Sequence, residues 1–223
     1  MEINSKGRVI VIEGACDGVG KSTQLELLKK HLEEDGHQIC NHHFPSYHTY
    51  HGAPVERYLQ GEYGNVSDLS PYFVNSLYGI DRAITWKIKL EKLYNEGNIV
   101  LLDRYTTSSL IYQSALIEDI DKRKEFIDYV IDFEYDKLGV KRPDKVIFLT
   151  APFDLVQEMK NKRQDNDGVK NDIHERNIEF MKKVYDNALF VANYLSFDIV
   201  ECSSNGKMDS ISNIHSKVYK LVK

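Results

Sequence analysis

Two kinds of hydrophobic pattern alternate along the chain. Short apolar runs, several of them β-branched, predict buried strands, and segments whose apolar residues recur every three or four positions predict helices. The expected strands cover residues 9–12, 38–44, 99–102, 145–149 and 198–201. The expected helices cover residues 21–34, 54–60, 71–94, 123–138, 153–162, 172–194 and 209–221, with a polar stretch at 163–171. This alternation predicts an α/β fold whose mostly parallel sheet is covered by helices on both faces.

The longest expected helix has Ser70 as its cap and Pro71 at its first position, and Gly97 follows its end. Its apolar residues recur at steps of three and four, at Phe73, Leu77, Ile80, Ile84 and Ile88. Such spacing predicts that these five side chains form the buried face of the helix.

The strongest chemical signal lies in residues 9–23, which read VIVIEGACDGVGKST. A buried strand enters a turn that contains three glycines, and Lys21 and Ser22 then open a helix, which is the order of a phosphate-binding loop. Backbone N–H groups, the positive end of a helix and one ammonium suit a polyphosphate, and the Ser22 hydroxyl suits Mg²⁺. The register departs from the usual pattern, because Ala15 stands where a glycine is normal and Gly14 comes one position too early. The loop is therefore one residue longer, bulged near Cys16, or carries Ala15 in place of glycine; a glycine-rich turn that binds nothing is the plainer alternative.

Length and composition narrow the class of protein. With 223 residues, of which 42% are hydrophobic, the chain can bury one sizeable core, so we expect one domain. A net charge of −5 and a pI near 5.9 argue against a general nucleic-acid or membrane surface. No apolar stretch approaches a membrane span, and we expect a cytoplasmic protein.

The three cysteines are scattered, without the spacing of a zinc site or a disulfide framework. Cys16 alone sits beside the expected phosphate site, either as a small packing residue or as a redox-sensitive thiol.

Four separated stretches together resemble the thymidylate kinase family of P-loop nucleoside monophosphate kinases. They are IEGACDGVGKSTQ, LYGIDR, DRYTTSSLIYQ, and RPDKVIFLTAPFDLV followed by HERNIEFMKKVYDNA, and the resemblance spans roughly residues 8–194. The resemblance implies a three-layer P-loop kinase fold, with one domain over residues 1–223 and a lid near 160–175. It also implies Mg²⁺-dependent transfer of a phosphoryl group from ATP to dTMP, giving dTDP, by a homodimer.

The resemblance also implies a role for each matching residue. Lys21, Arg104 and Asp103 would serve catalysis, and Ser22 and Asp103 would serve the metal. ATP would contact Gly14, Asp17, Gly18, Val19, Gly20, Lys21, Ser22 and Thr23, with Arg163 from the lid. The acceptor nucleotide would contact Asp17, Phe44, Tyr78, Arg82, Arg104, Ser108, Tyr112 and Gln113. Within these sets, Tyr78 would stack on the thymine ring, Asp17 would bond the sugar 3′-hydroxyl, and Arg104 with Arg82 would grip the acceptor phosphate.

Two positions depart from the family pattern. Many members carry an arginine two residues after the proline of Phe44-Pro45, where this chain has Tyr47. Either His48, His51 or Arg57 replaces that arginine, or the acceptor phosphate is held less tightly. In members with glycine after the loop aspartate, as at Gly18, the arginine that contacts the transferred phosphoryl group is expected in the lid. The lid candidates here are Arg163, Lys162, Lys170 and Arg176, and Ile173 occupies a place where arginine is common.

These departures keep two other functions open. One is a kinase of the same fold that acts on another nucleoside monophosphate or on a deoxynucleoside. The other is a regulatory protein that binds a nucleotide without transferring its phosphate, against which the retained Lys21, Ser22, Asp103 and Arg104 argue.

Overall fold

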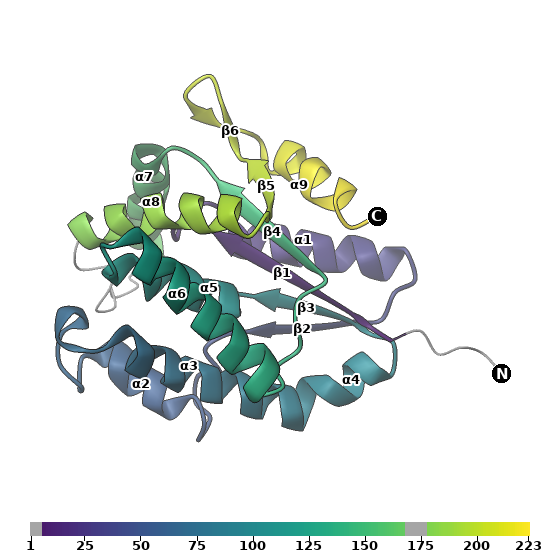
Figure 1. Cartoon of the computed structure of the whole chain (residues 1–223). Coiled ribbons are helices and arrows are strands. Elements are labelled where there is room, and N and C mark those ends of the chain that lie inside the picture. Colours follow the sequence, from purple (N-terminus) through teal and green to yellow (C-terminus); the bar gives the residue numbers. More distant parts are fainter. Residues whose placement is uncertain (1–5, 168–177) are drawn as a thin grey trace.

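The structure is a computed structural model that describes residues 6–167 and 178–223, including all of their side chains except those of residues 67 and 162–167. Within these residues five parallel strands form the central sheet: β1 (Arg8–Gly14), β2 (Ile39–His43), β3 (Ile99–Asp103), β4 (Lys145–Thr150) and β5 (Asp198–Glu201). Their order across the sheet is β2-β3-β1-β4-β5 (Figure 1). The predicted α/β fold with a parallel sheet is confirmed.

Helices cover both faces of the sheet and make a three-layer molecule (Figure 1). One face carries α1 (Lys21–Glu34) and α9 (Ile211–Lys220), which contact each other. The other carries α3 (Pro71–Thr85), α4 (Glu91–Asn95), α5 (Thr106–Tyr112), α6 (Ile120–Ile131) and α8 (Ile178–Tyr194). This division follows from right-handed crossovers: the chain moves one way across the sheet from β1 to β2 and the other way from β2 through β5.

Shorter elements complete the description. They are α2 (Ala53–Gln60), α7 (Phe153–Asp167), 3-10 turns at Val66–Asp68 and Ser114–Leu116, and a small hairpin of β6 (Ser203–Ser204) and β7 (Lys207–Met208). Wide π-helical turns at Trp86–Leu90 and Asp132–Lys137 extend α3 into α4 and lengthen α6. The predicted helices 71–94 and 123–138 are therefore each helical throughout but with a change of pitch.

The prediction for the apolar stripe of α3 was wrong. Phe73, Ile80 and Ile88 are 44%, 44% and 62% exposed. The inward face of the helical run instead carries Val74, Asn75, Gly79, Asp81, Arg82, Thr85 and Trp86. The polar side chains of α3 face inward because they meet the loop after β2 and the helix after β3, and its apolar row is left on the outside.

Three smaller differences from the predicted elements concern α5, α7 and the hairpin. The sequence did not predict α5 or the β6–β7 hairpin, and α7 continues as a helix to Asp167, into the stretch expected to be an irregular polar segment. Residues 168–177, which include Lys170, Ile173 and Arg176, lie outside the described residues.

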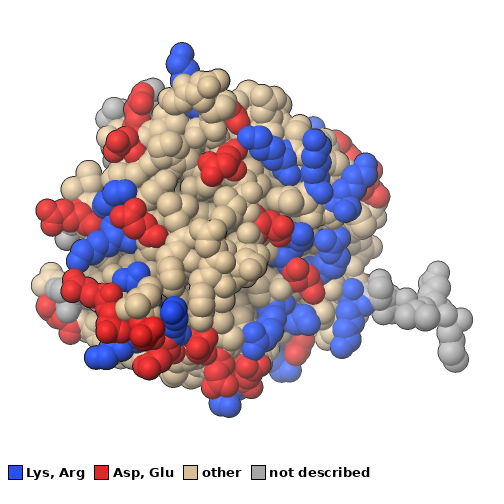
Figure 2. Space-filling view, turned by 45° about the horizontal axis from the view of Figure 1, so that its top comes forward, with Lys and Arg blue, Asp and Glu red and all other residues tan. Residues whose placement is uncertain are grey.

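Both signs of charge occur on the face shown in Figure 2. Basic side chains gather on its right side and acidic side chains at its lower left, around a largely uncharged centre. None of the described helices combines the length and apolar composition that crossing a bilayer requires.

Candidate functional site

A pocket of about 270 Å³ opens at the carboxyl ends of the central strands. Its walls come from the loop after β1, the loop after β2, helix α3, the end of β3 and helix α5. The lining residues are Asp17, Gly18, Gly20, Lys21, Ser22, His43, Phe44, Pro45, Tyr47, Leu59, Tyr78, Arg82, Asp103, Arg104, Tyr105, Ser108, Ser109, Tyr112 and Gln113. Open α/β sheets bind ligands at this edge, so the fold itself selects the place.

The glycine-rich loop keeps its shape through two left-handed residues and one close approach. Gly18 and Gly20 have φ angles of 106° and 100°, which side chains rarely adopt. A Cβ on Gly18 would also lie 2.8 Å from the carbonyl oxygen of Val156, because α7 packs directly against the loop. The N–H of Ala15 still bonds the Leu149 carbonyl of β4 at 3.3 Å, so the loop leaves the sheet only after Ala15.

Cys16 is a packing residue of this loop. Its side chain is fully buried, with Sγ 3.9 Å from the carbonyl oxygen of Met181. Burial raises the pKa of the thiol to about 12, above the range in which a thiolate forms at neutral pH.

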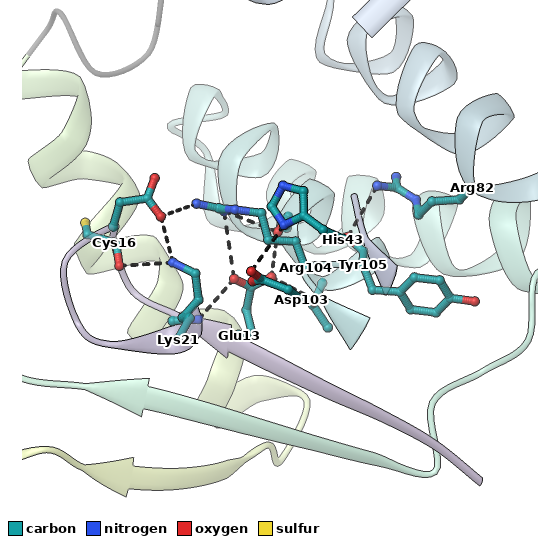
Figure 3. A network of polar contacts seen from close by, with 12 residues as sticks. Glu13, Cys16, Lys21, His43, Arg82, Asp103, Arg104 and Tyr105 are labelled. Carbon is teal, nitrogen blue, oxygen red and sulfur yellow. Dashed lines mark hydrogen bonds and ion pairs between the residues drawn. The ribbon is translucent and has the colours of Figure 1, made fainter. Parts of the chain in front are cut away.

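Lys21 and Arg104 converge on one oxygen atom (Figure 3). Lys21 Nζ donates to Asp17 Oδ1 at 2.7 Å and to the Cys16 carbonyl at 3.3 Å, and Arg104 Nη2 donates to the same Asp17 Oδ1. Burial would raise the pKa of Asp17, but the charges of Arg104 and Lys21 outweigh it and hold that pKa well below its ordinary value. The space between the two cations is therefore built for a negatively charged oxygen.

Glu13 lies next to Arg104 at the end of β1. It was not among the predicted site residues. It is completely buried at the end of β1 and accepts hydrogen bonds from Thr107 Oγ1 at 2.9 Å and Ser108 Oγ at 2.6 Å. Its Oε1 lies 4.0 Å from Arg104 Nη1. An acidic residue inside the otherwise apolar run VIVIEG was the sequence signal that pointed to it.

Asp103 lines the same pocket, and its two carboxylate oxygens have different surroundings. His43 Nδ1 is 3.1 Å from Asp103 Oδ2, and Oδ1 is buried without a hydrogen-bond partner among the described residues (Figure 3). Burial works to raise the pKa of Asp103, but the His43 hydrogen bond and the charge of Lys21 lower it, so the group stays ionised. His43, which lines the pocket, is a second residue of the site that sequence reasoning missed, because only strand pairing places it opposite Asp103.

Arg82 is held in a buried ion pair. Its Nε and Nη2 donate to the two oxygens of Glu134 at 2.6 Å each, Nη2 also donates to Ser109 Oγ at 2.6 Å, and Nη1 donates to the Tyr105 carbonyl at 3.3 Å. Burial by itself lowers the pKa of Arg82, and the Glu134 carboxylate more than offsets this, so the guanidinium remains charged. The Tyr78 ring lies 5.7 Å from the guanidinium carbon, and both residues line the pocket.

The other predicted site residues are only partly brought together. Phe44, Ser108, Tyr112 and Gln113 line the pocket, with the Tyr112 ring 5.5 Å from the Arg104 guanidinium carbon. Gly14, Val19 and Thr23 do not line it: Gly14 ends β1, Val19 is buried and Thr23 is exposed. The backbone of Arg163 is part of α7, and its side chain, like that of Lys162, lies outside the described residues.

None of the three candidates for replacing the arginine expected at Tyr47 lines the pocket. The His48 side chain is 92% exposed, that of His51 is 5% exposed beneath the loop, and Arg57 faces solvent. Tyr47 itself does line the pocket, and so does His43.

A family model described as thymidylate kinase matches residues 12–213, which include every residue that lines the pocket. The chain belongs to the thymidylate kinase family. It is 29% identical over 177 residues to the thymidylate kinase of Mycobacterium tuberculosis, covering 78% of this chain and 81% of the relative. It is 30% identical over 216 residues to that of Campylobacter hominis, covering 96% and 100%. The fold is similar to the solved structure of thymidylate kinase from Candida albicans, with a TM-score of 0.72 at 24% identity over 97% of this chain and 91% of the other.

For a member of the thymidylate kinase family, the pocket divides naturally into two halves. The glycine-rich loop and Asp103 form one half, and Phe44, Tyr78, Arg82 and the α5 residues form the other. Arg104 stands between them, since it reaches Asp17 on one side and Tyr112 on the other.

The metal expected in this family has suitable residues here. Within residues 6–167 and 178–223, no group of three or more His, Cys, Asp or Glu side chains is arranged to hold a metal ion alone. Mg²⁺ does not need one, because it takes most of its ligands from phosphate and water and only one or two from the protein. Asp103 Oδ1, which has no hydrogen-bond partner among the described residues, and Ser22, which lines the same pocket, offer oxygen ligands of that kind.

Proposed function

We propose that this protein transfers the γ-phosphoryl group of ATP to dTMP and releases dTDP and ADP. The observation that carries the proposal is the single oxygen, Asp17 Oδ1, which accepts hydrogen bonds from both Lys21 and Arg104. One of these cations belongs to the phosphate-binding loop and the other to the acceptor half of the pocket. A phosphoryl group in transit between two nucleotides needs positive charge from both sides.

The residues then have separate tasks. Lys21 and the backbone N–H groups of the loop hold the β- and γ-phosphates of ATP, and Arg104 holds the acceptor phosphate. Phosphate oxygens replace Asp17 Oδ1 between the cations, which leaves the Asp17 carboxylate to accept the sugar 3′-hydroxyl. Tyr78 stacks on the base, and Arg82, fixed by Glu134, faces the acceptor nucleotide. No general base is required, because the acceptor phosphate oxygen is already anionic at neutral pH.

Ser22 and Asp103 would hold Mg²⁺ with the nucleotide, directly or through its water shell. When bound, Mg²⁺ neutralises charge on the β- and γ-phosphates. His43 keeps Asp103 Oδ2 occupied, and Asp103 Oδ1 has no hydrogen-bond partner among the described residues. Removing Mg²⁺ with EDTA should abolish turnover, and added Mg²⁺ should restore it.

A third cation, which would contact the transferred phosphoryl group, is assigned to a lid near residues 160–175 of a single domain. Arg163 on α7 is the candidate. Support comes from the close packing of α7 against Gly18, where no side chain fits. An Arg163→Ala variant should lower kcat with little change in the KM for dTMP.

The test of the function is ADP release from Mg-ATP with a panel of acceptors: dTMP, dUMP, dCMP, dGMP, dAMP and thymidine, and a control without acceptor. The proposal expects clear preference for dTMP. A different preferred acceptor would show a kinase of the same fold with another substrate, and equal release without acceptor would contradict phosphoryl transfer altogether.

We further propose a homodimer, formed through the exposed apolar row of α3. Phe73, Ile80 and Ile88 project from one side of this helix and its extension, and all three are between 44% and 62% exposed. Family members are usually dimers, and a row of this kind suits a self-complementary contact. Light scattering should give twice the chain mass of 25.8 kDa, and Ile80→Arg should give a monomer.

A further inference from the structure

The loop of residues 44–52 and helix α3 face each other across the acceptor half of the pocket. From the loop come Phe44, Pro45 and Tyr47, and from the helix come Tyr78 and Arg82. The width of this half is therefore set by whatever fixes the loop against the helix.

A buried carboxylate on α3 makes that connection. Asp81 is completely buried, and its Oδ2 accepts the backbone N–H of Ser46 at 2.8 Å. The Ser46 hydroxyl lies 2.8 Å from Thr85 Oγ1, one helical turn further along α3. Ser46 is thus held to the helix by its backbone and by its side chain at once.

A chain of hydrogen bonds behind Ser46 has a fixed direction. Lys89 Nζ, which can only donate, is 3.1 Å from His42 Nδ1, so the ring proton of neutral His42 lies on Nε2 and is donated to Ser46 Oγ at 3.0 Å. The Ser46 proton then points to Thr85 Oγ1, which also meets His51 Nε2 at 3.0 Å. Burial, followed by the nearby charges of Lys89 and the other histidines, lowers the pKa of His42 to about 4, which agrees with a neutral ring.

The loop is also closed upon itself by its own hydrogen bonds. Thr49 Oγ1 donates to the Ser46 carbonyl at 2.6 Å and accepts the Gly52 N–H at 3.0 Å. A Cβ on Gly52 would lie 2.1 Å from the Ser46 carbonyl oxygen, so the turn is wound too tightly for a side chain there.

From this geometry we propose that Asp81 is a positioning residue for the acceptor nucleotide: it presets the loop of residues 44–52 before the nucleotide binds. The proposal rests on the proposed function, which makes this half of the pocket the acceptor site. It also accounts for Tyr47, because a loop that the protein itself holds in place does not depend on an arginine gripping the phosphate to become ordered. Preorganisation of this kind raises affinity by reducing the ordering that binding must impose.

The test compares Asp81→Ala with Asp81→Asn in steady-state kinetics, with dTMP and ATP varied separately. Asp81→Ala leaves the Ser46 N–H without an acceptor in a buried position, so the KM for dTMP should rise about tenfold or more while the KM for ATP stays within about twofold. Asp81→Asn keeps a carbonyl oxygen at the same place and should restore most of the dTMP affinity. The amide proton of Ser46 should exchange faster with solvent in the alanine variant.

Asn75→Ala is the matched control. Asn75 is buried on the same helix, and its side chain has no hydrogen-bond partner among the described residues. The two alanine variants therefore delete comparable groups, of which one holds the loop. The KM for dTMP should change only in the Asp81 variant.

Thr85→Val keeps the proposal testable if Asp81→Ala does not fold. It preserves the shape of the side chain, removes the hydroxyl between Ser46 and His51, and should raise the KM for dTMP about threefold. Equal losses in kcat with both KM values unchanged, or equal effects of Asn75→Ala and Asp81→Ala, would overturn the positioning role. Failure of the proposed function is a separate result, because the unmodified protein would then fail to phosphorylate dTMP.

Discussion

Replacing Glu134 by leucine should destabilise the protein strongly. Glu134 is completely buried, holds Arg82 through two hydrogen bonds of 2.6 Å, and accepts a third from Thr106 Oγ1 at 2.7 Å. Leucine is similar in volume but leaves the Arg82 guanidinium, 1% exposed, without its counter-charge. The variant separates the electrostatic role of Glu134 from its packing role.

The expected magnitude follows from the burial of both partners. Breaking a buried ion pair by removing one partner costs about 3–5 kcal/mol of the free energy of unfolding. For a domain of this size, each kcal/mol lowers Tm by roughly 2–4 °C, so Tm should fall by about 6–20 °C. Replacing both partners, as in Arg82→Met with Glu134→Leu, removes the uncompensated charge and should recover at least half of the loss. The double variant should nevertheless remain inactive, since the proposed mechanism places Arg82 against the acceptor nucleotide.

Thermal unfolding followed by circular dichroism, together with urea titration, measures these differences. Glu91→Gln is the control, because Lys87 and Glu91 form an exposed pair of 2.7 Å and such pairs contribute only about 0.5 kcal/mol. A fall in Tm below about 3 °C for Glu134→Leu, or a double variant less stable than the single one, would refute the reasoning.

Three further outcomes are expected. Lys21→Ala and Arg104→Ala should each lower kcat/KM about a hundredfold or more with an unchanged circular dichroism spectrum, and near-normal turnover would remove that residue from the proposed mechanism. Tyr78→Ala should raise the KM for dTMP roughly tenfold without changing the KM for ATP, as loss of base stacking predicts; an equal rise in both would point to a general disturbance. Because the pKa of Cys16 is raised to about 12, the fraction of thiolate is negligible at pH 8 and grows only as pH approaches that value. Iodoacetamide should therefore label Cys16 slowly in the native protein and fast after unfolding, as mass spectrometry can show, and rapid native labelling would contradict the burial.

Elements whose signals are local were predictable from the sequence. The helix α1 starts and ends where expected, because Gly20-Lys21 and Asp35-Gly36 mark its two ends. The three inner strands, β1, β3 and β4, were found because buried parallel strands are short apolar runs. The order of the strands across the sheet could not be predicted from any single strand, because it depends on how the connections between the strands cross the sheet.

Helix α5 escaped prediction because its sequence, TTSSLIY, is poor in strong helix formers. Its hydroxyl groups have tertiary partners instead: Thr107 and Ser108 bond Glu13, and Thr106 bonds Glu134. The apolar row of α3 was wrongly predicted to be buried. Hydrophobic periodicity shows that one face of a helix is apolar, but it does not show whether another part of the protein covers that face.

The candidate site likewise contains residues that the sequence predicted and contacts that it could not predict. Lys21, Asp103 and Arg104 stand in contiguous motifs, and the structure brings them to one pocket. Glu134 is 52 residues away from Arg82 in the chain and Glu13 is 94 residues away from Thr107, so their contacts depend on the completed fold. The apolar run around Glu13 hints that this carboxylate is buried, but no spacing in the sequence identifies its partners.

The register of the sheet sets a common frame for the chemistry. Asp103, the residue proposed for the metal, pairs with His43 on one side and with Ile12 on the other. The last residue before the loop 44–52, the last residue of β3 and a residue near the end of β1 therefore lie in one row across three strands. Neighbouring strands are about 4.8 Å apart, and backbone hydrogen bonds hold that spacing. The sheet thus fixes the spacing between the elements that carry the two halves of the pocket, while the loops beyond it carry most of the residues proposed to contact the substrates. Substrate choice can therefore diverge by exchanging loop residues while the distance over which the phosphoryl group travels stays the same.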